Sequence, residues 1–272
     1  MPESQPRSRA SVWRAKLAWP LALLGLMLLA WEAVVRLFAL PHYILPAPSL
    51  VFATLWDKWP IFALHGAVTL QEVVGGAALG VAVGTLLALL MFFAAPLEKA
   101  LYPLLIASQN VPVFAIAPLL VVWFGYGYWP KVLMAAVIVF FPITVSALDG
   151  LKRTDPDQLR LFQTLGATPA QTLWKLRVPA ALPALFSGLK IGAIYSTIGA
   201  VIGEWVGAGA GLGYLMLSAN AQLRVAEVFG AIFCLIPVGL TLLGAVVLAE
   251  HWLMPWQRTP AAGESAWTET LP

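Results

Sequence analysis

The amino-acid sequence predicts an all-α integral membrane protein with about six transmembrane helices. Of its 272 residues, 60% are hydrophobic and only 11% are charged, which is far outside the range of a soluble domain. The apolar residues also come in long blocks rather than in short amphipathic periods. A helix needs roughly 20 apolar residues to cross the hydrocarbon core of a bilayer, and the blocks have about that length.

Six apolar blocks are bounded by charged residues, proline or glycine. They cover residues 17–40, 73–95, 101–124, 132–148, 185–206 and 228–249. Together they predict a membrane domain over 17–250, preceded by an N-terminal tail (1–16) and followed by a C-terminal tail (251–272).

The basic residues predict the orientation of the chain. With the N-terminus inside the cell, only Arg36, Lys58, Lys131 and Arg224 fall on outer segments, and the other twelve Lys and Arg residues fall on inner ones. Basic residues of short loops are retained in the cytoplasm, so we expect both termini and the long loop 150–184 there. The same distribution explains the formal net charge of +3, and nucleic acid is not an expected partner.

The first apolar block follows a basic N-terminus, which is also typical of a cleavable signal peptide. The block is too long for such a signal and no clear cleavage site follows it, so we expect a retained helix. Cys234 is the single cysteine and lies in the sixth block. Neither a disulfide framework nor a cysteine metal site is therefore expected, and the three histidines are too scattered for a metal motif.

The first two blocks are separated by Leu45-Pro46-Ala47-Pro48-Ser49. Prolines block a helix, and Ser49 can cap a short helix that begins at Leu50. The aromatic residues of that helix suit the outer membrane interface, and a simple linker is almost as consistent with the pattern. Within the first block, Glu32 and Arg36 are four residues apart and are predicted to form an ion pair.

Glycine recurs at every fourth position in two segments. One set falls on a ridge of the second block and the other on a ridge of the fifth: Gly76, Gly80 and Gly84, and Gly199, Gly203, Gly207 and Gly211. Such ridges let helix backbones approach closely. The two sets predict a compact helix bundle, with the Gly-Ala repeat at 207–211 ending the fifth helix.

The loop 150–184 has the most specific pattern. Asp155 or Asp157 can cap a helix with Pro156 near its first turn, and Gly166 can end that helix in a left-handed conformation. A second short helix is expected after it.

This second helix can be capped by Thr168, with Pro169 at its first position. Pro179 and Pro183 are then expected to bend the chain into the fifth span.

The same loop resembles the EAA loop of the permease subunits of bacterial ATP-binding-cassette (ABC) importers. The core of that loop is a Gly-Ala pair, followed at a fixed distance by an L-P-x-x-x-P-like element. Four residues match this core: Gly166, Ala167, Pro179 and Pro183. The leading Glu-Ala-Ala of the family is absent, and its places are held by Arg160, Leu161 and Phe162.

The resemblance implies the type I importer permease fold in a bacterial inner membrane. It also implies that the loop docks on an ATPase dimer through Leu159, Arg160, Phe162, Leu165, Gly166, Ala167, Pro179 and Pro183. The other partners implied are a periplasmic or lipid-anchored substrate-binding protein and a second copy of the permease. ATP and Mg would be used by the ATPase, and no cofactor is expected on this chain.

The resemblance extends from Leu45 to Leu215 and is greatest to permeases for taurine, alkanesulfonates, nitrate, riboflavin and thiamin pyrimidine precursors. The segment 195–205 looks most like members that serve thiamin pyrimidines or riboflavin. A thiamin-pyrimidine precursor or riboflavin is therefore the expected substrate, with taurine, an alkanesulfonate or nitrate as the alternative.

Polar residues inside the apolar blocks are candidates for the translocation pathway, because such groups usually face a cavity or a partner. Gln109, Asn110, Tyr195 and Glu204 are the candidates. Gln109 and Asn110 could equally bond a neighbouring helix, and Glu204 could simply reach interfacial water. Glu72, at the start of the second block, is interpreted as a solvated helix end.

No phosphate-binding loop, hydrolase elbow or metalloprotease motif is present. The sequence therefore predicts a non-catalytic subunit. A secondary transporter would need inverted repeats and midplane charges, and a membrane scaffold would leave the long proline-rich loop unexplained.

Overall fold

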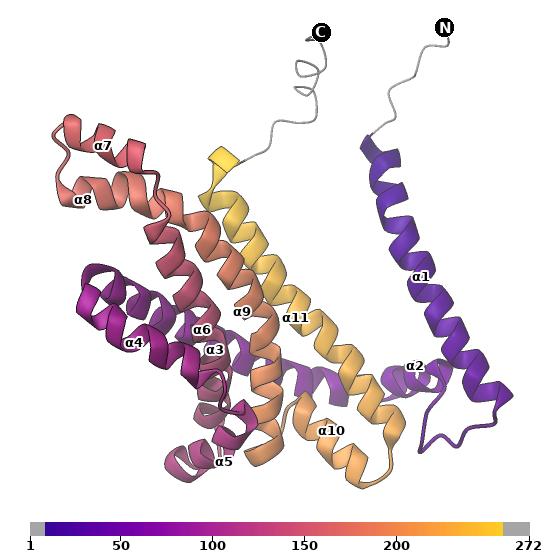
Figure 1. Ribbon diagram of the computed structural model, residues 1–272. Coiled ribbons are helices and arrows are strands. Elements are labelled where there is room, and N and C mark those ends of the chain that lie inside the picture. The colour runs from indigo at the N-terminus through magenta and orange to yellow at the C-terminus, as the bar shows by residue number, and fades with distance from the viewer. Residues whose placement is uncertain (1–8, 258–272) are drawn as a thin grey trace, which may run out of the picture. The chain divides into compact units, whose positions relative to one another are not determined.

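The computed structural model describes residues 9–257, with side chains from Ala18 to Trp256. The ends of both predicted tails, 1–8 and 258–272, lie outside the described residues. Within them every regular element is a helix (Figure 1). The elements are α1 (Arg9–Leu37), α2 (Pro48–Asp57), α3 (Trp59–Phe93), α4 (Ala95–Ser108), α5 (Val113–Phe124), α6 (Tyr128–Lys152), α7 (Pro156–Thr164), α8 (Pro169–Thr172), the π-helical turn η1 (Leu173–Arg177), α9 (Val178–Gly207), α10 (Leu212–Ala221), α11 (Val225–Leu253) and the 3₁₀ turn η2 (Pro255–Gln257).

Five stretches of helix are long and apolar enough to cross a membrane, and the bent pair α4 and α5 gives a sixth if it counts as one span. The predicted all-α membrane fold with about six spans is confirmed. The third predicted span, 101–124, is not one helix, because the chain bends by 102° between Ser108 and Val113. Pro112 explains the break, since it cannot donate a backbone hydrogen bond and disfavours helix at the residue before it.

The described residues form two compact units: residues 9–64 with Leu215–Cys234, and His65–Tyr214 with residues 235–257. In the first unit the predicted ion pair is confirmed, with Arg36 2.6 Å from Glu32. The predicted cap of α2 is wrong: Ala47 holds the N-cap position and Pro48 starts the helix. Ser49 instead donates its amide and its hydroxyl to the Glu32 carboxylate, at 3.0 and 2.8 Å.

In the second unit, α6 packs against α9 and against residues 65–93 of α3 (Figure 1). All of the first predicted glycine ridge, Gly76, Gly80 and Gly84, and the first half of the second, Gly199 and Gly203, lie against α6. Gly207 instead lies against Val121 of α5, and Gly211 against the side chain of Glu204. A Cβ atom at Gly76 would be 2.3 Å from the Cβ of Ala135, and one at Gly199 would be 2.5 Å from the Cα of the same alanine. Real side chains cannot fit at such distances, so the glycines are what lets three helices pack this closely.

Candidate functional site

The loop between α6 and α9 forms the two short helices expected from its capping residues, and Figure 1 shows them beyond the ends of α6 and α9. Asp155 caps α7 by accepting a hydrogen bond from the amide of Asp157 at 2.8 Å, and Pro156 is the first helical residue. Gly166 has a φ of +70°, the left-handed conformation expected just after a helix. These three predictions are confirmed.

Thr168 caps α8 as predicted. Its hydroxyl accepts from the amide of Gln171 at 3.2 Å, and the Gln171 side chain accepts from the Thr168 amide at 2.9 Å, which is a capping box. Pro179 and Pro183 do not precede the fifth span but lie inside α9, which begins at Val178. Pro179 lies in the first turn, where a proline removes no helical hydrogen bond, and Pro183 lies inside the helix without ending it, so the helix starts earlier than expected.

Six of the eight predicted coupling residues lie together on α7 and the turn after it. They are Leu159, Arg160, Phe162, Leu165, Gly166 and Ala167. None of the residues of α7 is buried, and Leu165 is 74% exposed. The loop thus carries apolar side chains that the described residues of this chain do not cover.

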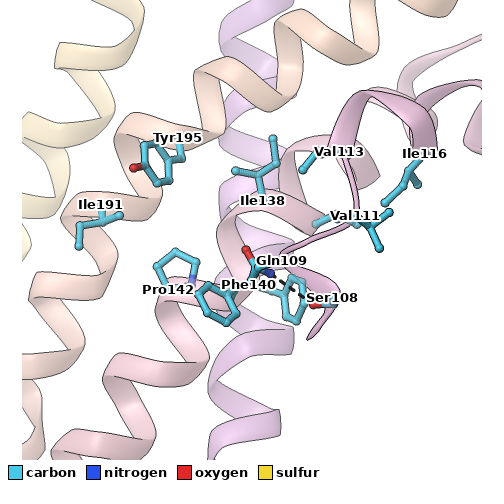
Figure 2. Close-up of a pocket in the computed structure, with 12 residues that line it drawn as sticks. Ser108, Gln109, Val111, Val113, Ile116, Ile138, Phe140, Pro142, Ile191 and Tyr195 are labelled. Atoms are coloured by element: carbon cyan, nitrogen blue, oxygen red, sulfur yellow. Dashed lines mark hydrogen bonds between the residues drawn. The ribbon is translucent and has the colours of Figure 1, made fainter. Parts of the chain in front are cut away.

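A cavity of about 570 Å³ lies where the break between α4 and α5 meets α6 and α9 (Figure 2). Two of the predicted pathway residues line it, Gln109 and Tyr195, and Figure 2 shows them on opposite walls. The other lining residues are Ser108, Val111, Val113, Ile116, Val137, Ile138, Phe140, Phe141, Pro142 and Ile191. No charged residue is among them.

The polar groups of the cavity are few. Gln109 donates from its side-chain nitrogen to the hydroxyl of Ser108 at 3.3 Å, and Ser108 donates to the carbonyl of Leu105 at 2.7 Å. Tyr195 is half-exposed. Asn110 does not line the cavity, and its side chain donates to the carbonyl of Ala107 at 3.3 Å.

Glu204 is not among the residues that line this cavity and is only 1% exposed. One carboxylate oxygen accepts from the hydroxyl of Thr69 at 2.6 Å, and the other accepts from the amides of Gly213 and Tyr214 at 2.5 and 3.3 Å. The first amides of a helix have no partner within it. Glu204 therefore caps α10 from the end of α9. A direct contact between Glu204 and a substrate stays a prediction.

Two residues of α3 complete this cap. Thr69 accepts from the amide of Leu212 at 2.8 Å, and His65 accepts from the amide of Gly211 at 2.9 Å. Gly211 has a φ of +113°, and a Cβ atom there would be 2.2 Å from the carboxylate carbon of Glu204. The cap thus explains why glycine is needed at this position. The helix α10 and the capping roles of His65 and Thr69 were not predicted from the sequence.

Glu72 is not the solvated helix end that the sequence suggested. It is 1% exposed, and its carboxylate lies 3.1 Å from the ammonium group of Lys131 on α6. The reason is that α3 begins at Trp59, well before the predicted block, so Glu72 lies in the middle of the helix. A buried charge of this kind needs a partner, and Lys131 provides it.

Comparison with known proteins identifies the family to which this chain belongs. Residues 80–254 match the family model described as the inner membrane component of binding-protein-dependent transport systems. The chain belongs to this family. It is therefore the permease subunit of an ABC importer, a multi-pass membrane protein that does not itself hydrolyse ATP; a partner ATPase does so. This excludes the secondary transporter and the scaffold.

Relatives and solved structures agree with this assignment. The chain is 42% identical to a probable ABC transporter permease protein of Haemophilus influenzae, over 89% of this chain and 97% of that one. It is 41% identical to the formylaminopyrimidine transport permease protein ThiX of Halalkalibacterium halodurans, over 86% and 93%. The riboflavin transport system permease protein RibX of Chloroflexus aurantiacus is 36% identical, over 90% and 91%.

The fold is shared with a chain of the MetNI methionine ABC transporter in an inward-facing conformation. The TM-score is 0.63 at 17% sequence identity, and the match covers 72% of this chain and 98% of that one. At this identity the match shows the fold alone.

Proposed function

We propose that two copies of this chain form the membrane pathway of an importer for a small, uncharged, planar polar compound. A thiamin-pyrimidine precursor fits best and riboflavin next. A periplasmic or lipid-anchored binding protein delivers the compound, and an ATPase dimer drives the cycle with ATP and Mg. The complex resides in the inner membrane of a bacterial cell, with both termini of the chain in the cytoplasm.

The chemistry of the cavity carries the choice of substrate. Its volume of about 570 Å³ lies in the range of small-molecule sites, roughly 300–1,000 Å³. A sulfonate or nitrate ion entering it would lose hydration without meeting a basic side chain, which is costly. A neutral heteroaromatic ring can stack on Tyr195 and hydrogen-bond with Gln109.

Two relatives support the same choice, since ThiX and RibX carry pyrimidine and flavin transport in their names. The taurine transport system permease protein TauC of Escherichia coli is 29% identical to this chain, over 92% of it and 94% of that protein. Taurine, alkanesulfonates or nitrate are therefore the alternative. The absence of charge among the cavity residues speaks against it.

The exposed loop is proposed to dock on the ATPase in the cytoplasm. Leu161 and Leu165 are exposed on and just after α7, and apolar side chains on a short helix suit a groove on a partner protein. Arg160, which stands in the place of the leading glutamate of the family's loop, is also exposed, and its one ion pair among the described side chains is with Asp157 of the same helix, at 3.3 Å. It is free to contact the ATPase.

Ligand screening of the cognate binding protein by thermal shift tests the substrate. We expect formylaminopyrimidine to raise the melting temperature by several degrees, because a ligand at 100 times its Kd adds about 2.7 kcal/mol of stability. Riboflavin should give a smaller shift. Taurine, an alkanesulfonate and nitrate, each of which carries a negatively charged group, serve as the controls. Stabilisation by any of these three compounds, with none by pyrimidines or flavins, would overturn the substrate and leave the importer assignment standing.

A further inference from the structure

The π-helical turn η1 joins the exposed loop to α9. The amide of Val178 donates to the carbonyl of Leu173, five residues earlier, instead of four as in an α-helix. Such turns are rare and are frequent at functional sites. Every movement of α7 and α8 must pass through this turn to enter α9 along the chain.

The turn also has room to deform. An apolar cavity of about 180 Å³ lies beside it, lined by residues of α3, α6 and α9 and by Trp174 of the turn itself. Trp174 is 69% exposed. Since side chains that border this cavity lack contacts with other protein atoms on that side, they resist displacement less than those of a filled core. The turn alone would therefore absorb part of any movement of the loop.

Arg177, the last residue of the turn, contacts both α3 and α6 and so links η1 to these two helices. Its guanidinium carbon lies 5.1 Å from the centre of the Phe92 ring at the end of α3, within the range of a cation–π contact. The same guanidinium donates to the carbonyl of Leu151 at 3.4 Å, near the end of α6. The loop leaves α6 one residue after Leu151, so Arg177 ties the two ends of the loop to each other and to α3.

The helices that Arg177 joins are tightly packed at the same level. A Cβ atom at Gly150 of α6 would lie 2.9 Å from the carbonyl oxygen of Ala181 on α9. The base of the loop on α6 and α9 is therefore stiff, and η1 is the one π-helical turn among the described residues.

We propose that Arg177 is the positioning residue that transmits movement of the loop to α3, α6 and α9 together. It does so by preventing η1 from absorbing that movement. The proposal rests on the docking of the loop on the ATPase. Without the contacts of Arg177, the ATPase would still bind the loop and hydrolyse ATP, but fewer cycles of hydrolysis would move the membrane helices. Hydrolysis and import would then become uncoupled.

The test measures substrate imported per ATP hydrolysed by the complete complex of permease, ATPase and binding protein in proteoliposomes. We expect Arg177→Ala and Phe92→Leu each to lower this ratio about threefold or more, in the range found for residues that couple two sites. Arg177→Lys should rescue only in part, because lysine lacks the planar guanidinium. The matched control is Arg153→Ala, since that arginine is 81% exposed in a 3.9 Å pair with Asp149.

A second measurement needs no substrate. Hydrogen exchange is compared before and after the complex is trapped with ATP and vanadate. In the wild type, trapping should change the exchange rates of backbone amides as far as the end of α3. In Phe92→Leu, the changed exchange rates should be confined to residues 156–177. An unchanged ratio of import to hydrolysis, or an exchange change that reaches α3 equally in the variants, overturns the proposal. Failure of the wild type to import any tested compound would instead count against the proposed substrate, and the exchange experiment would still decide the role of Arg177.

Discussion

Glu204→Leu is expected to prevent accumulation of the folded permease. The leucine would leave the amides of Gly213 and Tyr214 without their acceptor, and the hydroxyl of Thr69 would keep only its longer bond to the carbonyl of His65, at 3.2 Å. Each buried group that loses its partner costs about 1–3 kcal/mol, and two such losses with a weakened third bond are a large fraction of the stability of a typical domain, about 5–15 kcal/mol. The amount of monodisperse protein in a detergent extract measures the effect.

Glu204→Gln is the matched variant for this experiment. Its amide oxygen can still accept from the two backbone amides and its nitrogen can donate to Thr69, so most of the yield should remain. Glu250→Leu serves as the control, because that glutamate forms a half-buried ion pair with Lys190 at 2.5 Å and caps no helix. A normal yield of Glu204→Leu with import lost would show that Glu204 acts in the pathway and not as a cap.

Gly166→Glu is expected to abolish import while the permease still folds. Gly166 has a φ of +70°, and no atom lies within 4 Å of a Cβ built there, so the change meets no clash. The cost is conformational, about 1–2 kcal/mol for an ordinary residue in the left-handed region. The new carboxylate also lies on the surface proposed to enter the groove of the ATPase.

Gly166→Asn separates these two causes, because asparagine tolerates the left-handed conformation. We expect it to retain most of the import activity. The measurements are ATP-driven uptake and copurification of the ATPase with the permease. Wild-type uptake by Gly166→Glu would contradict the role assigned to the loop.

The sequence predicted the loop well because the information there is local. Asp155, Thr168 and Gly166 act on backbone groups within a few residues of themselves, so their types and spacing are sufficient. The glycine ridges were also predictable, since periodicity alone puts each set on one face of a helix. Which helix they would meet was not.

The sequence could not predict features that depend on distant partners. Glu204 and Thr69 are 135 residues apart, and no sequence pattern near either residue indicates that they are in contact. Glu72 was misread for the same reason, because its partner Lys131 lies on another helix. The π-helical turn has no recognised residue pattern, and it was visible only in the backbone.

ATP-driven uptake in proteoliposomes tests the central claim most directly. The reconstituted complex would contain this chain, its ATPase and its binding protein, and uptake of labelled formylaminopyrimidine would be followed with unlabelled competitors. The account predicts accumulation that requires ATP, Mg and the binding protein, that riboflavin reduces, and that excess taurine or nitrate leaves unchanged. Accumulation without ATP, or uptake of taurine or nitrate in place of the pyrimidine, would contradict it.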